Sequence, residues 1–459
     1  MPAGNPERLA VVGAGYVGLA TAVCLAHLGH HVVCAERDPA KLARLSSGEP
    51  TIVEDGLPEL LRDGLASGRL RFVPEAVQAV PGAGYVFLCV PTPARSDGSA
   101  DVTILQQVAA EIGPHLDRDA VVVNKSTVPV GSTQVVEQLL GRADVAVVSN
   151  PEFLREGRSV HDCLHPDRVV VGAQDQAAAA RVGALFARTG APLIVTDAAT
   201  AEMIKYASNA FLATRLSFVN AVATLAERLG ADVRDVLLGL GYDHRIGFEF
   251  LRPGPGWGGS CFPKDTSALL YMAEQAGYDF PLLRAVIDTN EAQLASVVDK
   301  VRAAAGGDLA GRRVAAWGLA FKAGTDDRRD SPAVWVVRRL ADEGALVRAY
   351  DPTTVPAGPG AGVAGSAGVP GGDDGGGAGG SGSEVPELEG RAEIVADPYA
   401  ACEDAAALVI LTEWDELRWL DFTKVRDAMA APAVVDGRNL LDPAQLRRLG
   451  FTYIGIGRP

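Results

Sequence analysis

The feature that most restricts the fold is the apolar stretch LAVVGAGYVGLATAVCLAHLG near the N-terminus. Its first three glycines have the spacing G-x-G-x-x-G and stand between a strand-like run and a helix-like run. In that context one glycine makes a tight turn, the next lets a pyrophosphate approach the backbone, and the third allows helix and strand to pack closely. We therefore predict a dinucleotide-binding turn, with a simple glycine turn as the alternative, made of Gly13, Gly15, Tyr16, Val17 and Gly18.

The same stretch is apolar over about 20 residues and follows Arg8, so its composition also resembles that of a signal peptide or a membrane anchor. The glycines argue against that interpretation, because they divide the run into a strand, a turn and a helix. We expect neither a signal peptide nor a membrane segment here.

Short β-branched runs alternate with helix-like patterns along the first part of the chain. The strand-like runs are LAVVGAG, HHVVCAE, YVFLCVP, AVVVNKST, VAVVSNP and RVVVGA. Near-continuous apolar strands between helices indicate a parallel sheet that is covered on both faces. After Gly311 the alternation returns, with Ser331 and Pro332 in the positions of a helix N-cap and first turn.

We predict an α/β protein with two Rossmann-like, doubly wound domains joined by a long central helix and a helical connector. The first domain covers residues 1–199, the connector with a dimerisation surface residues 200–305, and the second domain residues 306–459. The second domain lacks a G-x-G-x-x-G turn, so its ligand need not be a dinucleotide. Its residues 355–387 are rich in glycine and poor in bulky side chains, which predicts a disordered insertion.

Composition excludes several classes of function. The net charge of -15 argues against a general nucleic-acid surface, which needs clustered lysine and arginine. The six cysteines include no C-x-x-C pair, and no histidine cluster has zinc-ligand spacing, so we expect neither a metal site nor a structural disulfide. Cys34 and Cys89 lie in apolar runs and are predicted to be buried. This cysteine usage fits a reducing, cytoplasmic location.

Glu36 follows the glycines by about twenty residues and ends the second strand-like run. An acid in that place binds the ribose hydroxyls of NAD, whereas the extra phosphate of NADP calls for a cation. We expect NAD as the cofactor, and Arg37, the next residue, keeps NADP open as the alternative.

A second group of polar residues points to chemistry on a thiol. The stretch GWGGSCFPKD places Cys261 in a loop-like run ahead of Lys264 and Asp265. Lys205 and Asn209 are four residues apart, so they share one face of a predicted helix that is otherwise rich in apolar residues. A lysine among apolar residues needs a partner or a task.

Polar residues also follow two of the strand-like runs, where ligand-binding residues of open α/β sheets collect. Glu152 and Glu156 follow one run, and Ser126 and Thr127 follow another. A cysteine can trap an aldehyde as a thiohemiacetal, hydride loss gives a thioester, and water then releases an acid. A cation stabilises the oxyanions and a carboxylate acts as general base. Taken singly, each residue could instead be a solvated, turn or cap residue.

In these motifs the chain resembles the UDP-glucose 6-dehydrogenase family of nucleotide-sugar dehydrogenases. The matching segments are GAGYVGL, KSTVPVG, NPEFLREG, KYASNAFLATRLSF, YDHRIG, GWGGSCFPKD, AFKAGTDDRRDSP and VVDGRN, in the family's order over almost the whole chain. The resemblance implies that UDP-glucose, two NAD and water give UDP-glucuronate and two NADH in a cleft between the domains. It also implies a homodimer at least as the assembly.

The resemblance implies roles for the catalytic residues. Cys261 would be the nucleophile, and Lys205 would steady oxyanions and, with Asp265, position the water and move protons. Glu152 would be the general base of thioester hydrolysis, and Thr127 would lie with it around that water.

The resemblance also assigns residues to the two ligands. Asn209 would orient the sugar. Besides the glycine turn, cofactor contacts are expected from Glu36, Lys41, Thr92, Thr127, Glu156, Lys264 and Arg329. Contacts with the UDP-sugar are expected from Glu152, Phe153, Leu154, Arg155, Glu156, Lys205, Asn209, Arg245, Phe250, Leu251, Arg252, Pro253, Gly254, Gly258, Lys322 and Arg438. Arg245 is expected to reach the site of a neighbouring subunit.

Other functions remain as alternatives. GDP-mannose 6-dehydrogenase has the same chemistry with a different sugar nucleotide. The UDP-N-acetylmannosamine branch usually carries a histidine just before the cysteine, where this chain has Ser260. A two-electron hydroxyacid dehydrogenase would not need the cysteine. A silent NAD-binding sensor or scaffold would have no reason to keep the full set of Thr127, Glu152, Lys205, Asn209, Cys261 and Asp265.

Overall fold

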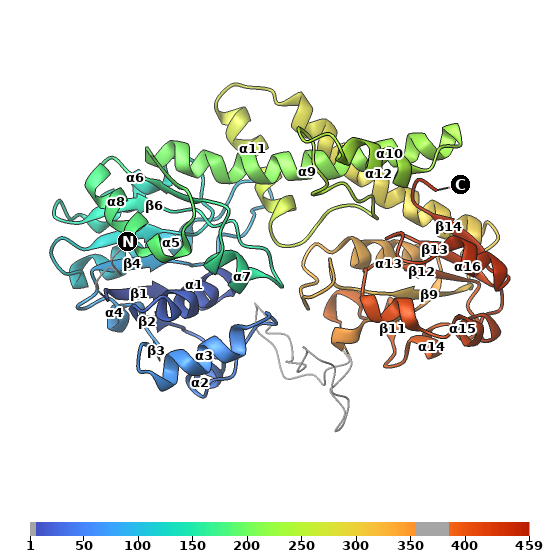
Figure 1. Cartoon of the computed structure of the whole chain (residues 1–459), viewed down its shortest axis with the longest axis horizontal. Helices are drawn as coiled ribbons and strands as arrows, with labels where there is room; N and C mark the ends of the chain where they lie inside the picture. Colours follow the sequence, from blue (N-terminus) through green and yellow to red (C-terminus); the bar gives the residue numbers. More distant parts are fainter. Residues whose placement is uncertain (1–5, 355–384, 459) are drawn as a thin grey trace. The chain divides into compact units, whose positions relative to one another are not determined.

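The computed structural model describes residues 6–354 and 385–458. Their contacts divide the chain into two compact units (Figure 1). Unit 1 contains Met1–Ser208 and Ser267–Tyr278, and unit 2 contains Asn209–Thr266 and Asp279–Pro459. The predicted insertion at residues 355–387 lies outside the described residues except for its last three, where Val385 is buried and a 3-10 helix begins at Pro386.

Unit 1 is built on an eight-stranded sheet with the strand order β3-β2-β1-β4-β5-β6-β7-β8. The strands are β1 (Arg8–Val12), β2 (His31–Ala35), β3 (Leu70–Val73), β4 (Tyr85–Leu88), β5 (Val121–Asn124), β6 (Ala146–Ser149), β7 (Val169–Gly172) and β8 (Leu193–Thr196). All neighbouring strands of this sheet pair in parallel except β6 and β7, which meet antiparallel at Ser149 and Gly172.

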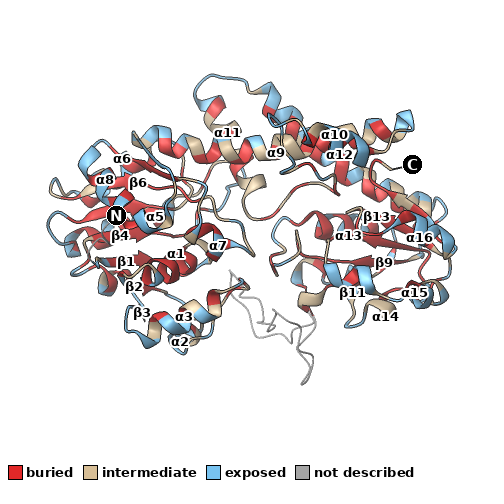
Figure 2. Ribbon diagram, viewed as in Figure 1, coloured by how far each residue is buried: buried red, intermediate tan, exposed pale blue. Residues whose placement is uncertain are grey.

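Helices cover both faces of this sheet, and Figure 2 shows β1, β2 and β4 as mostly buried strands. The helices are α1 (Tyr16–His27), α2 (Pro39–Ser46), α3 (Leu57–Ala66), α4 (Ala76–Ala79), α5 (Thr103–Ile112), α6 (Ser132–Leu140), α7 (Ser159–Leu164) and α8 (Gln176–Leu185). Alternate residues of β1 enter two separate cores: Leu9 and Val11 pack into one, and Ala10 and Val12 into the other. The near-continuous apolar strands therefore reflect burial on both faces, as predicted.

Unit 2 contains a six-stranded, wholly parallel sheet with the order β11-β10-β9-β12-β13-β14. The strands are β9 (Arg313–Trp317), β10 (Leu346–Tyr350), β11 (Ala392–Ile394), β12 (Ala407–Ile410), β13 (Ala433–Asp436) and β14 (Thr452–Gly455). Its shorter helices are α13 (Pro332–Asp342), α14 (Pro398–Ala401), α15 (Phe422–Ala428) and α16 (Pro443–Arg448). Ser331 caps α13 through a bond from the Ala333 amide, as predicted from the Ser-Pro pair.

The predicted helical segment is present as four helices, α9 (Ala198–Leu229), α10 (Val233–Gly241), α11 (Phe262–Gln275) and α12 (Pro281–Ala304). Helix α9 begins in unit 1 and ends in unit 2. Fully buried residues recur at helical spacing along it, among them Ala201, Ala213 and Ala223. The predicted fold class, two Rossmann-like domains joined by a long helix, is confirmed.

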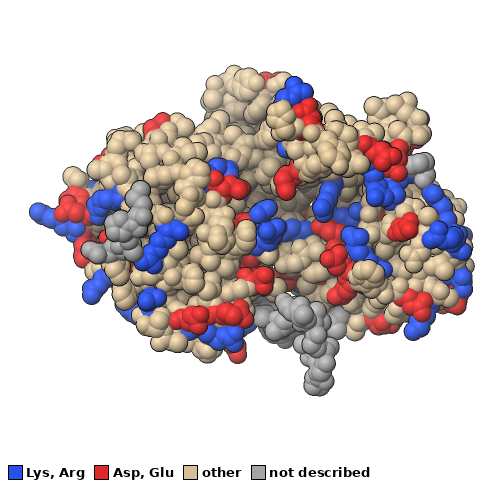
Figure 3. Space-filling view, viewed as in Figure 1, with Lys and Arg blue, Asp and Glu red and all other residues tan. Residues whose placement is uncertain are grey.

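Two further observations concern the whole described chain. Among residues 6–354 and 385–458, no helix combines the length and apolarity that a membrane crossing requires. On the face shown in Figure 3, lysine and arginine side chains are interspersed with aspartate and glutamate on each unit.

Candidate active site

The glycine turn follows β1 in unit 1. Gly13 has φ +97, and its N–H donates to Ala35 O at 3.0 Å, so the turn is tied to the end of β2. A Cβ on Gly18 would lie 1.9 Å from Gly13 O, so helix α1 can pack on the turn only with glycine there. A Cβ on Gly15 would meet no protein atom within 4 Å. Packing within the protein therefore does not require glycine at position 15. A ligand that comes close to the backbone at Gly15 would require it.

Helix α1 begins at this turn with no side-chain cap on its N-terminus. The first N–H groups of a helix carry partial positive charge and lack partners within the helix. Such an end is suited to a phosphate group. Glu36 directly follows β2 and is half-buried, with Oε1 accepting from Asp38 N at 2.9 Å. These residues fit the pyrophosphate and the ribose of a dinucleotide.

The loops after β4 and β5 are joined by hydroxyl groups. Thr92 Oγ1 donates to Thr127 O at 2.8 Å, so two predicted cofactor residues meet. Ser126 Oγ donates to Val90 O at 2.7 Å. The backbone around Thr127 is therefore fixed against the neighbouring loop.

Glu202 of α9 fixes the other end of the Thr127 loop. Its carboxylate accepts from Gly131 N at 2.6 Å and from Thr133 N at 2.9 Å, which caps the start of α6. Burial raises the pKa of Glu202, although the bonds from Thr133 and Gly131 oppose that shift. Because Glu202 lies one turn before Lys205 on α9, the helix that carries Lys205 also holds the loop that carries Thr127.

Glu152 and Lys205 form a buried ion pair in unit 1. Lys205 Nζ lies 2.7 Å from Glu152 Oε1, and the two side chains are 5% and 6% exposed. Glu152 Oε2 accepts from Leu154 N at 2.6 Å. Burial alone would raise the pKa of Glu152, but the ammonium of Lys205 and these hydrogen bonds lower the pKa below its ordinary value. Glu152 is therefore a carboxylate at neutral pH.

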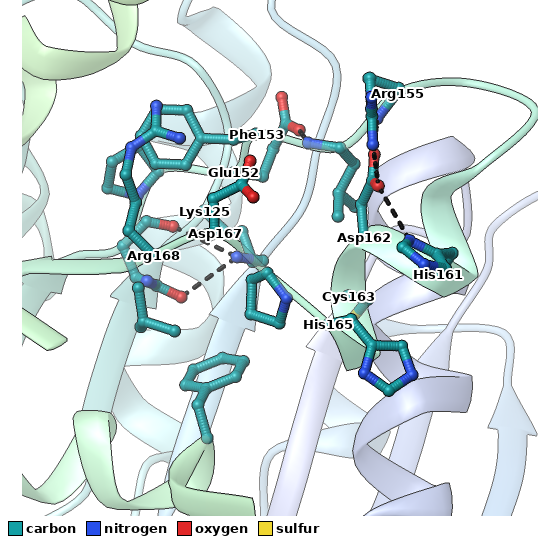
Figure 4. Close-up of a pocket in the computed structure, with 16 residues that line it drawn as sticks. Lys125, Glu152, Phe153, Arg155, His161, Asp162, Cys163, His165, Asp167 and Arg168 are labelled. Carbon is teal, nitrogen blue, oxygen red and sulfur yellow. Dashed lines mark hydrogen bonds and ion pairs between the residues drawn. The ribbon is translucent and has the colours of Figure 1, made fainter. Parts of the chain in front are cut away.

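The loop that carries Glu152 is held at several further points. Arg155 binds Asp162 with two bonds, at 2.8 and 2.6 Å, and His161 lies beside that carboxylate (Figure 4). Farther along, Glu54 accepts from Gly157 N at 2.7 Å. The loop is thus fixed by one charged partner nearby in sequence, Asp162, and one that is distant, Glu54.

A cavity of about 110 Å3 lies under this loop in unit 1 and is lined in part by Glu152 and Cys163 (Figure 4). Lys125, on its wall, donates to Asn150 Oδ1 at 3.1 Å, and burial lowers the pKa of this lysine. The guanidinium of Arg168 stacks 3.7 Å from the centre of the Phe153 ring. The cavity is therefore lined by side chains that help to hold the Glu152 loop in place.

Cys261 lies at the start of α11 in unit 2. Asp265 N donates to Cys261 O at 2.9 Å, which makes Cys261 the N-cap residue of the helix. Ser260 Oγ lies 3.6 Å from the sulfur. Cys261 is partly exposed, whereas the other five cysteines are buried, including Cys34 and Cys89 as predicted. A helix N-terminus favours a thiolate over a thiol.

Asp265 lies one turn into α11 and is almost fully buried. Asn209 Nδ2 donates to its Oδ2 and Lys264 Nζ to its Oδ1, both at 2.5 Å. Three of the predicted residues therefore meet in unit 2, close in sequence to Cys261. Helix α9 supplies Lys205 to unit 1 and, one turn later, Asn209 to unit 2.

The predicted UDP-sugar residues of unit 2 form two groups. Near β9, Arg438 Nη2 donates to Phe321 O at 2.8 Å, and Lys322 Nζ lies 5.3 Å from the Phe321 ring. Gly254 also lies close to Arg438, since a Cβ on Gly254 would be 3.4 Å from Arg438 Nη1.

The second group lies in the segment ahead of α11. Phe250 has φ +58 and its ring lies 6.5 Å from that of Phe262, while Leu251 is buried. Arg245 is exposed and pairs with Asp243 at 2.6 Å. Arg329 is paired with Asp327.

Sequence reasoning missed three supporting residues: Lys125, Glu54 and Glu202. Only Lys125 carried a signal, because a lysine stood at the end of an apolar strand in NKSTVPVG. No group of three or more histidine, cysteine, aspartate or glutamate side chains in the described part of the chain could hold a metal ion.

The sequence matches three domains of one family. They are described as UDP-glucose/GDP-mannose dehydrogenase family, NAD binding domain (residues 7–189), central domain (residues 199–292) and UDP binding domain (residues 315–443). Similar curated proteins include UDP-glucose 6-dehydrogenase of Pseudomonas aeruginosa, 44% identical over 98% of each chain. The UDP-glucose 6-dehydrogenase of Rhizobium meliloti is 42% identical over 98% of this chain and 100% of its own.

Solved structures agree. A UDP-glucose dehydrogenase from Pyrobaculum islandicum has a TM-score of 0.85 at 36% identity and covers 99% of this chain and 98% of its own. A UDP-D-ManNAc dehydrogenase from Pyrococcus horikoshii has a TM-score of 0.82 at 27% identity, covering 98% and 99%. The whole length of the chain is therefore shared with these proteins.

Proposed function

Because the chain belongs to the UDP-glucose/GDP-mannose dehydrogenase family, we propose that this dehydrogenase oxidises UDP-glucose to UDP-glucuronate through a thioester on Cys261. The overall reaction converts one CH2OH group, two NAD+ and one water into a carboxylate, two NADH and three protons. The relatives named UDP-glucose 6-dehydrogenase and the UDP binding domain match support this substrate. NAD, when bound, accepts the hydride in both oxidations.

The observation that carries the proposal is the placement of Cys261. It is the partly exposed thiol among six, and it directly precedes the first residue of the 14-residue helix α11. A nucleophilic cysteine needs access to substrate and a surrounding that favours its thiolate. A cysteine that only fills space would be buried like the other five.

The first oxidation removes a hydride from C6 and a proton from its hydroxyl, and gives an aldehyde without using the thiol. Cys261 Sγ then bonds to the aldehyde carbon, and the C=O double bond becomes a C–O single bond. Loss of the second hydride restores C=O as a thioester. Lys205 steadies the oxyanions through its buried ammonium, and Asn209 orients the sugar.

Hydrolysis of the thioester needs a base and a water. Glu152 suits the role of base because its carboxylate is ionised at neutral pH. Glu152 takes a proton from the water as the water oxygen bonds to the thioester carbon, the C–S bond breaks with its electron pair returning to Cys261 as the thiolate, and the two protons of the water pass to solution. Asp265, with Lys205, positions this water and moves protons, and Thr127 lies beside it.

The proposed assembly is a homodimer. Phe211, Phe218 and Leu225 are spaced seven residues apart on α9 and are 62%, 58% and 55% exposed. An apolar stripe of this spacing fits a second copy of the same helix. Sedimentation equilibrium gives the mass in solution that checks this assembly.

The test of function is the yield of NADH per sugar nucleotide, with UDP-glucose, GDP-mannose and UDP-N-acetylmannosamine offered separately. We expect two NADH per UDP-glucose and little from the others. Cys261→Ser should form the first NADH and little acid, because a hydroxyl at this place lacks the thiolate's nucleophilicity. Full acid formation by Cys261→Ser would contradict the thioester route, and a yield from GDP-mannose alone would reassign the substrate.

A further inference from the structure

The loop that leads to Cys261 has no helix or strand of its own. It runs from Leu251 to Ser260 and contains the sequence GPGWGG. A partly buried loop must find partners for its backbone N–H and C=O groups outside regular secondary structure. Those partners decide where the loop, and hence the start of α11, is held.

Two amide side chains of α12 supply these partners. Asn290 Oδ1 accepts from Trp257 N at 2.7 Å, and Asn290 Nδ2 donates to Trp257 O at 2.9 Å. Gln293 Nε2 donates to Gly254 O at 2.7 Å. Asn290 and Gln293 are 6% and 4% exposed and lie three residues apart, on one face of the helix. Asn290 thus satisfies both backbone groups of one loop residue.

Helix α9 holds the same loop with two more side chains. Asn220 Oδ1 accepts from Gly254 N at 2.9 Å, and Ser217 Oγ accepts from the indole N–H of Trp257 at 2.9 Å. Both side chains are buried. We call Ser217, Asn220, Asn290 and Gln293 the loop clamp.

The loop fits tightly among its surroundings in unit 2. Gly256 has φ +136, and a Cβ there would lie 2.9 Å from Asn290 Oδ1. A Cβ on Gly258 would lie 2.1 Å from Asp330 O. The glycines therefore let the backbone reach the clamp and the neighbouring segment, and larger residues would push the loop off its position.

We propose that Asn290 and Gln293 are positioning residues that hold Cys261 where its sulfur can reach the aldehyde. This inference rests on the proposed function. The clamp acts on Cys261 through the backbone of the loop, which it binds at Gly254 and Trp257. Misplacement of a reacting atom by about 1 Å is enough to slow a reaction strongly. The first oxidation does not use the thiol, so the clamp affects the second oxidation more.

The variants are Asn290→Ala and Gln293→Met, and the control is Thr289→Ala. Thr289 precedes Asn290 on α12, and its hydroxyl donates to Ala285 O within the helix. Gln293→Met keeps the length and shape of the side chain and removes one bond to the loop. If Asn290→Ala does not fold, Gln293→Met alone tests the proposal.

Two measurements follow in the full-length protein. In single turnover with UDP-glucose, we expect Asn290→Ala to form the second NADH at least about tenfold more slowly relative to the first. In the absence of ligands, iodoacetamide should alkylate Cys261 at least about threefold faster, because a released loop exposes the sulfur. Gln293→Met should show smaller effects of the same sign, and Thr289→Ala neither.

The combination of a more accessible sulfur and a slower second oxidation is what a purely structural role would not produce. Equal slowing of both oxidations, or unchanged kinetics with faster alkylation, would overturn the proposal. If the wild-type protein forms no NADH from UDP-glucose, the proposed function is wrong, and the alkylation rates alone then test the loop clamp. Equal alkylation rates would then overturn the clamp, and a faster rate in Asn290→Ala would support it.

Discussion

The turns after β1 and β9 stand at the same place in two sheets whose central strands follow the same order. Gly13 and Gly318 both have positive φ, +97 and +90. Gly13 N donates to Ala35 O at the end of β2, and Gly318 N donates to Tyr350 O at the end of β10. The two turns are therefore built alike up to this point.

The two turns differ in the acceptor that binds the backbone N–H groups following the glycine. In unit 2 the carboxylate of Asp351, the residue after β10, accepts from Leu319 N at 2.6 Å and from Ala320 N at 3.1 Å. In unit 1 Glu36, the residue after β2, accepts from its own loop at Asp38 N instead. The N-terminus of α1 has no side-chain cap. An acid after the second strand thus binds the next turn in unit 2, whereas in unit 1 we propose that it serves a ligand.

The largest effect is expected from Asp351→Ala. Asp351 is fully buried, so its loss leaves buried N–H groups without an acceptor, which should lower the free energy of unfolding by about 3 kcal/mol. Urea unfolding measures this. Glu36→Ala is the matched control, and we expect it to change stability by less than about 0.5 kcal/mol while weakening NADH binding. Equal losses of stability in the two variants would show that both acids stabilise the fold to the same extent, which would contradict this comparison.

A smaller effect should separate the glycines of the two turns. Gly318→Ala places a Cβ 2.4 Å from Thr412 Cβ, which should cost about 2 kcal/mol of stability. Gly15→Ala meets no protein atom within 4 Å, so its stability should stay unchanged while the Kd for NADH rises about tenfold. Fluorescence titration with NADH and thermal unfolding check the pair. A Gly15→Ala protein that binds NADH normally would contradict the assignment of this turn.

The smallest effect is a difference in pH dependence between two buried carboxyl groups. Burial raises the pKa of Asp436 in unit 2, so the folded state loses stability as pH rises above about 4. In unit 1, despite burial, Lys205 holds the pKa of Glu152 low, so the stability that Glu152 provides is lost as pH falls below about 4.5.

Relative to the wild type, Asp436→Asn should therefore gain stability as pH rises, and Glu152→Gln should lose it. The total change in each case amounts to about 1.4 kcal/mol per unit of pKa shift. Urea unfolding at several pH values from about 2.5 to 7 measures both changes, since the Glu152 contribution is lost only below about pH 4.5. Two slopes of the same sign would contradict the opposite shifts.

The sequence predicted the fold where its signals are local. Six strands of unit 1 were anticipated from apolar runs. Strands β3 and β8 were not anticipated. Arg71 interrupts the apolar run of β3, and β8 is an exposed edge strand, so neither shows the pattern of a buried strand. The antiparallel pairing of β6 with β7 depends on the path of the chain between them, which no local signal encodes.

For the candidate site, residue types were predictable and their partners were not. Glu152 and Lys205 are 53 residues apart, and Asn209 and Asp265 are 56 apart. Their pairing depends on how strands and helices pack over long range. Glu54 binds the Glu152 loop from 103 residues away and stands in no motif, so nothing near it in the chain indicates that role.

Because the N-terminus of α1 has no side-chain cap, the stability of unit 1 should depend on the concentration of a ligand in solution, whereas the stability of unit 2 should not. A ligand that binds only the folded state stabilises it by an amount that grows with its free concentration, about 2.7 kcal/mol at a hundred times Kd. The turn after β9 is bound instead by the carboxylate of Asp351, which belongs to the chain and is therefore present however dilute the protein is. The melting behaviour of unit 1 should therefore track the supply of nucleotide in the medium, while unit 2 holds its turn together in ligand-free protein.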